Sequence, residues 1–192
     1  MSRPCLIHLW IVLVAFFCLI APRTSQAGQE PFIQRVIVTN TTTDLLVYFD
    51  VDGAFASEEI RQAIFAGIPT TFTYQIELIE VRRVRRDATI IRLEVKRIIK
   101  YDPVAQKFAV TDRGHSGETA TTNDWSRAQQ LMTDISGLRI IPLAAIERGA
   151  TYRLRIRALI HKPKLPPVLS LIFFFVPLGD IETEWYEVAV RR

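Results

Sequence analysis

The sequence predicts a mainly β fold, an antiparallel two-sheet sandwich of the immunoglobulin-like kind with two short helices. Apolar and polar residues alternate over residues 71–80, 91–101 and 152–160, which is the period of a strand with one face in solvent. Turn-forming Asp, Gly and Pro residues separate these segments and the shorter apolar ones between them. An α+β fold, in which the helices cover one face of a sheet, is the alternative.

Shorter strands are expected where brief apolar or alternating runs end at turn residues. In chain order, the expected strands cover residues 33–39, 45–51, 71–80, 91–101, 107–111, 138–141, 152–160, 168–176 and 181–190. Residues 112–123 form the longest stretch without an apolar period, so we expect a solvated loop there.

Two helices interrupt the strands. Ser57 can cap a helix over residues 58–65, which has acidic residues in its first turn and a glycine and a proline after its end. A second helix begins near Asn123 or Asp124, where apolar residues follow at helical spacing up to Gly137. Both helices are short, so we expect them to cover an end or a face of the sheets.

Residues 1–27 predict a removable signal peptide. Arg3 precedes an apolar run over residues 6–21, and a small-residue motif ends at Ala27. The run is short for a spanning helix, which needs about 20 residues, so cleavage is favoured over an uncleaved inner-membrane anchor. We therefore expect an exported, periplasmic protein with one β-rich domain over residues 28–192.

Cleavage would leave a domain with little catalytic chemistry. The leader holds both cysteines, two basic residues and no acidic ones, so its removal lowers the net charge from +4 to +2. A net charge this close to zero does not favour nucleic acid as a partner. His115 and His161 lie too far apart in the sequence to form a ligand pair, and no nucleophile motif surrounds Ser116. We expect no enzymatic activity, no cofactor and no metal.

One basic cluster is the main candidate for a binding surface. It follows one long strand and continues on the next segment, and its members are Arg82, Arg83, Arg85, Arg86, Lys96 and Arg97. Such a patch suits an anionic partner, which is the acidic face of an envelope protein, an anionic lipid surface or a cell-wall polymer. The alternative is a solvated hairpin end whose charges neighbouring glutamates partly neutralise.

An apolar run is the second candidate. In residues 168–176 both faces of the expected strand are apolar, and Phe173, Phe174 and Phe175 lie at its centre. These phenylalanines could dock a partner, although a core strand covered by a helix is the simpler interpretation. Trp185 and Tyr186 are expected in the core and at the rim of the sandwich.

Several short motifs occur in a recognisable order along the chain. They are GIPTTFTY at residues 67–74, YD at 101–102, YRLRIR at 152–157, LP at 165–166 and WY at 185–186. In this order, and behind a signal peptide, they resemble a bacterial exported family catalogued as domain of unknown function 4390. The resemblance implies a bacterial envelope protein without known catalytic residues. Members of the family are encoded near a membrane sensor kinase of the nitrogen-regulation type, which implies a signalling or envelope partner.

Overall fold

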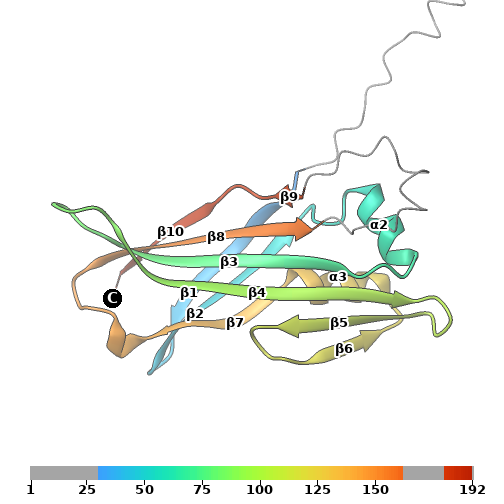
Figure 1. Ribbon diagram of the computed structural model, residues 1–192. Helices are drawn as coiled ribbons and strands as arrows, with labels where there is room; N and C mark the ends of the chain where they lie inside the picture. Colours follow the sequence, from blue (N-terminus) through green and yellow to red (C-terminus); the bar gives the residue numbers. More distant parts are fainter. Residues whose placement is uncertain (1–29, 162–179, 192) are drawn as a thin grey trace, which may run out of the picture.

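Two antiparallel sheets make up the computed structural model, which describes residues 30–161 and 180–191 (Figure 1). The smaller sheet has the strand order β1-β2-β7. The larger has the order β10-β8-β3-β4-β5-β6, and β9 also pairs with β8. Buried side chains from both sheets form one core between them, so the predicted two-sheet sandwich is confirmed.

The smaller sheet is built around its central strand. Its strands are β1 (Phe32–Asn40), β2 (Asp44–Asp52) and β7 (Ile135–Pro142), and a 3₁₀ turn over Leu143–Ala145 follows β7. Val47, Phe49 and Val51 alternate along β2 and are almost fully buried. This alternation is the reason that one face of β2 lies on the core while the other remains outside.

The larger sheet carries the candidate site. Its strands are β3 (Thr70–Val81), β4 (Ala88–Asp102), β5 (Lys107–Arg113), β6 (Thr119–Thr122), β8 (Thr151–His161), β9 (Ile181–Glu182) and β10 (Tyr186–Arg191). The expected loop over residues 112–123 therefore contains a strand. Its threonines and alanine give no apolar period, but threonine suits an edge strand such as β6.

Both predicted helices are present, but the second ends at Thr133, because Ile135 begins strand β7 and does not continue the helix. Helix α2 (Glu58–Phe65) begins after Ser57, whose hydroxyl accepts a hydrogen bond from the Ile60 amide. Helix α3 (Trp125–Thr133) begins after Asp124, whose carboxylate accepts one from the Ser126 amide at 2.9 Å. These caps satisfy amide groups that the first turn of a helix leaves without partners.

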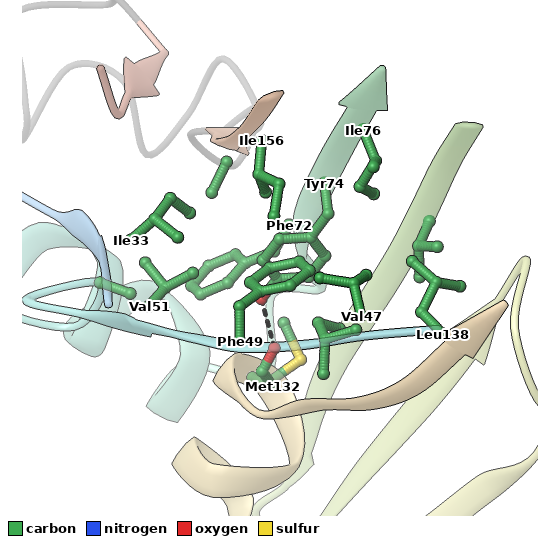
Figure 2. Close-up of a cluster of buried hydrophobic side chains, with 14 of the residues drawn as sticks. Ile33, Val47, Phe49, Val51, Phe72, Tyr74, Ile76, Met132, Leu138 and Ile156 are labelled. Carbon is green, nitrogen blue, oxygen red and sulfur yellow. Dashed lines mark hydrogen bonds between the residues drawn. The ribbon is translucent and has the colours of Figure 1, made fainter. Parts of the chain in front are cut away.

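The core between the sheets is closely packed and includes a buried phenol (Figure 2). Phe49 of β2 meets Tyr74 of β3 edge to face, with ring centroids 5.8 Å apart. The Tyr74 hydroxyl donates a hydrogen bond to the carbonyl of Met132 at the end of α3. Burial raises the pKa of Tyr74, so this group stays protonated and holds α3 against the large sheet.

Some predictions fall outside the described residues. They are the signal peptide over residues 1–27 and the strand over 168–176 with Phe173, Phe174 and Phe175. Within residues 30–161 and 180–191, no helix is long and apolar enough to cross a membrane.

Candidate functional site

The turn between β3 and β4, which we call the hairpin tip, comprises residues 82–87 and carries the four arginines of the predicted patch. It lies at one extreme end of the molecule (Figure 1), and all six of its residues are exposed. Val84 at its centre is 95% exposed. Arg82 is paired with Glu80, its Nε lying 2.8 Å from Oε2, whereas no ion pair holds Arg83, Arg85 or Arg86 within the described residues.

The structure does not bring all six predicted basic residues together. Lys96 lies eight residues along β4 from Ala88, which places it about 26 Å from the tip end of that strand. It is exposed on the outer face of the large sheet, and its Nζ lies 2.6 Å from Oε1 of Glu94. Arg97, the next residue, points to the opposite side and is buried.

Arg97 joins the large sheet to the end of α3. Its Nη1 donates hydrogen bonds to the carbonyl oxygens of Leu131, at 2.7 Å, and Asp134. Its Nη2 lies 3.4 Å from Oδ2 of Asp112 on β5, and both side chains are only 10% exposed. A cation at a helix C-terminus offsets the partial negative charge of the unpaired carbonyls. The position of Arg97 is therefore structural, and the side chain is not available to a partner.

The outer face of the large sheet carries a row of cross-strand polar pairs, which we call the polar ladder. It consists of Thr73, Gln75 and Glu77 on β3, paired with His161, Arg157 and Arg155 on β8. The three hydrogen bonds join Thr73 Oγ1 to His161 Nε2 at 2.9 Å, Gln75 Oε1 to Arg157 Nε at 2.8 Å, and Glu77 Oε2 to Arg155 Nε at 2.7 Å. The antiparallel register places Gln75 opposite Arg157 and Glu77 opposite Arg155.

Glu77 is the most enclosed charge of the ladder. Its carboxylate lies between Arg155 and Arg92 of β4, and Arg92 Nε is 2.5 Å from Oε1. The side chain is 7% exposed. Burial alone would raise the pKa of Glu77, but hydrogen bonds and charge from Arg155 and Arg92 together hold it below its ordinary value. Glu77 is therefore a fixed anion that orients two guanidinium groups.

Trp185 lies beside the ladder, although the sequence predicted it in the core. Glu182 of β9 pairs with Leu159, and Tyr186 of β10 pairs with Ile156. The three residues between Glu182 and Tyr186 therefore lie opposite only two residues of β8, which is a one-residue register shift. Such a β-bulge redirects a side chain to the other face of the sheet. The guanidinium carbons of Arg155 and Arg157 lie 4.5 and 4.7 Å from the centre of the Trp185 ring.

An open groove adjoins both the ladder and Trp185 on the outer face of the large sheet. Its volume is about 520 Å³, within the range of small-ligand sites. Its lining consists of Trp185, residues of β4, and four residues of the ladder, which are Gln75, Glu77, Arg155 and Arg157. Sequence reasoning missed this site, because its pairs join positions far apart in the chain and because nothing in the sequence marks the bulge.

The two histidines within residues 30–161 lie in different places. His115 is in the β5–β6 turn, where its backbone amide donates to Asp112. His161 links Thr73 and Asp180, and its Nδ1 is 2.9 Å from Asp180 Oδ2. This order of hydroxyl, imidazole and carboxylate is that of a catalytic triad, but Thr73 is only 3% exposed and so is closed to a substrate. The described part of the chain holds no group of three or more metal-ligating side chains.

Comparison with known proteins gives one match. The model of a family described as "Domain of unknown function (DUF4390)" matches residues 29–189. No curated protein and no solved structure matches the chain.

Proposed function

Because this chain belongs to the DUF4390 family, whose function is unknown, we propose a role from its own surfaces. It is an exported, non-enzymatic binding module of the bacterial envelope, and it docks through the hairpin tip onto an acidic face of a membrane or envelope protein. A membrane sensor kinase is one partner of this class. The observation that carries the proposal is a basic turn with three arginines free of ion pairs, at one extreme end of the described molecule.

The direction of the tip also favours a protein partner. Val81 at the tip end of β3 pairs with Thr151, whereas β9 pairs with the other end of β8. In Figure 1, β1 begins near β9, so the first described residues and the tip lie at opposite ends of the large sheet. Over the 12 residues of β3 this separation is about 40 Å. If the leader remained as an anchor, the tip would point away from that membrane and towards a partner.

Photo-crosslinking in living cells tests the protein contact. A photoreactive residue in place of Val84 is expected to give a specific adduct, because Val84 is surrounded by the free arginines. Val104 is the matched control, since it is a 93% exposed valine in the β4–β5 turn at the other end of the sheet. Replacing Arg83, Arg85 and Arg86 by serine is expected to abolish the adduct from position 84. An equal adduct from position 104, or one that survives the arginine changes, would contradict the proposal.

An anionic lipid surface is the second candidate, because the exposed Val84 between arginines could enter the interface of a bilayer. Each arginine near an anionic membrane contributes about 1 kcal/mol, so the three free arginines provide about 3 kcal/mol. Binding of this strength is weak and is screened by salt.

Co-sedimentation of the protein with lipid vesicles tests binding to an anionic lipid surface directly. At low salt, vesicles containing phosphatidylglycerol are expected to sediment a small fraction of the protein, and physiological salt is expected to release it. The same three serine substitutions would remove this binding. Binding that persists without the three arginines, or that salt does not weaken, would exclude the tip as a lipid contact.

A further inference from the structure

We propose that the β4 edge, which is the free side of residues Ala88–Val95 next to the hairpin tip, binds an extended acidic segment of the partner protein as an added β-strand. The inference deepens the proposed docking function and rests on it, because it says how the partner is held. In this mode of recognition, main-chain hydrogen bonds provide affinity and alternate side chains provide specificity.

The first argument is that this side of the large sheet has no neighbouring strand. Strand β4 pairs with β3 from Ala88 to Ile99, but β5 pairs with it only from Lys96 onward. Figure 1 shows β5 beside only the half of β4 that lies away from the tip. Among the described residues, Ala88–Val95 therefore have no strand on one side. The N–H and C=O groups of such an edge are open to an incoming strand, and an extended peptide has groups at the matching spacing.

The turn after β5 is the reason that this edge stays uncovered. Gly114 follows the last residue of β5 and has φ +121°, which glycine adopts at little cost. A Cβ at this position would lie only 3.0 Å from the carbonyl oxygen of Glu94, so the β4 edge ends there. Near the tip it is bounded by a bulge, where Thr89 and Ile91 pair with consecutive residues of β3. The stretch between these two limits is long enough for a short strand.

The second argument is a part of the core that remains uncovered beside this edge. On the inner face of the sheet, Ile76 and Leu78 of β3 are fully buried. Their partners on β4, Leu93 and Ile91, pack against the same core but are only partly buried. In the described part of the chain, β3 is the only strand that pairs with β4 at these positions. An added strand with an apolar residue at every second position would cover both side chains, which favours its binding.

The third argument is the charge at one end of the edge. A strand that runs beside Ile91 and continues along β4 reaches the hairpin tip. There Arg83, Arg85 and Arg86 have no ion pair within the described residues, and Asp87 is the only acid of the tip. The excess of positive charge favours acidic residues at that end of the incoming segment. The occupant is therefore a segment that alternates apolar and polar residues along the edge and ends in acids at the tip.

The test is a titration of the full protein with a synthetic peptide, Thr-Val-Thr-Val-Thr-Asp-Glu-Asp, that is acetylated and amidated at its ends. Since the pairings in the large sheet are antiparallel, this order places the acidic end at the tip. Binding is expected to slow hydrogen exchange of the edge-facing amides in Ala88–Val95 by about tenfold or more. Replacing Arg83, Arg85 and Arg86 by serine is expected to weaken binding by about tenfold.

Two N-methylated forms of the peptide test whether it binds as a strand. One form is methylated at two threonine nitrogens and the other at the two valine nitrogens. In an antiparallel ladder, alternate residues direct their N–H groups towards the neighbouring strand and the others away from it. One form is therefore expected to bind about tenfold more weakly or worse, and the other to keep its affinity. Equal binding by both forms would overturn the proposal.

Hydrogen exchange of the unaltered protein gives two further decisive results. Edge-facing amides of Ala88–Val95 that are protected before any peptide is added would overturn the proposal, because another part of this chain or a second copy would then occupy the edge. Exchange that saturating peptide leaves unchanged would also overturn it.

Crosslinking at Val84 in cells separates this inference from the docking function. A specific Val84 adduct without protection of the β4 edge by the peptide would overturn strand addition and leave docking at the tip in place. Protection of the edge without a Val84 adduct would support the edge as a peptide site and contradict the docking function.

Discussion

Arg97→Met is expected to lower the free energy of unfolding by about 3 kcal/mol, as measured by urea unfolding followed by circular dichroism. Asp112 would keep a carboxylate that is only 10% exposed but lose its cationic partner. The carbonyl oxygens of Leu131 and Asp134 at the end of α3 would lose their donor. Buried polar groups without partners are costly, so both losses act in the same direction.

The neighbouring residue provides the control. Lys96→Met changes the same strand by the same substitution, but Lys96 is 49% exposed and its ion pair is on the surface. We expect its effect to stay within about 0.5 kcal/mol. The double variant Arg97→Met with Asp112→Leu should lose less stability than the sum of the two single changes, because it leaves no buried charge. An Arg97→Met loss no larger than that of Lys96→Met would refute this account.

Much of the fold follows from local patterns. The alternation over residues 71–80 and 152–160 predicted β3 and β8, because one face of each strand lies on the core and the other is polar. Ser57, and Asn123 or Asp124, predicted the two helix starts, because such residues cap the first turn locally; the structure has Ser57 and Asp124 as the caps. Strand β6 was not predictable from periodicity, since its burial depends on pairing with β5 and not on an apolar face of its own.

The candidate site was harder to predict. Arg97 was grouped with Lys96 by charge, although the alternation that places Val95 in the core also places Arg97 on that side. The alternation in the sequence therefore already indicated that Arg97 lies on the core side of β4. It did not contain the pairing of Glu77 with Arg155, which are 78 residues apart and meet only through the register of β3 and β8. Trp185 depends on a one-residue bulge, and a bulge leaves no periodic trace.

Glu77→Gln is expected to lower the free energy of unfolding by about 2 kcal/mol near neutral pH, because charged hydrogen bonds to Arg92 and Arg155 become weaker. Glu94→Gln is the matched control. Glu94 also pairs with a cation on the outer face of β4, but it is 46% exposed. Its replacement should change stability by less than about 0.5 kcal/mol.

The effect of Glu77→Gln should also depend on pH in one direction. The pKa of Glu77 is lower in the folded protein than its ordinary value of 4.5, so its charge stabilises the fold fully above that value. As the pH falls through the folded pKa, the unaltered protein loses this contribution, whereas glutamine has no proton to gain. The difference between the two proteins should therefore narrow in acid unfolding measurements below about pH 4.5. A difference that stays constant or widens there would show that the side chain acts through its shape and not through its charge.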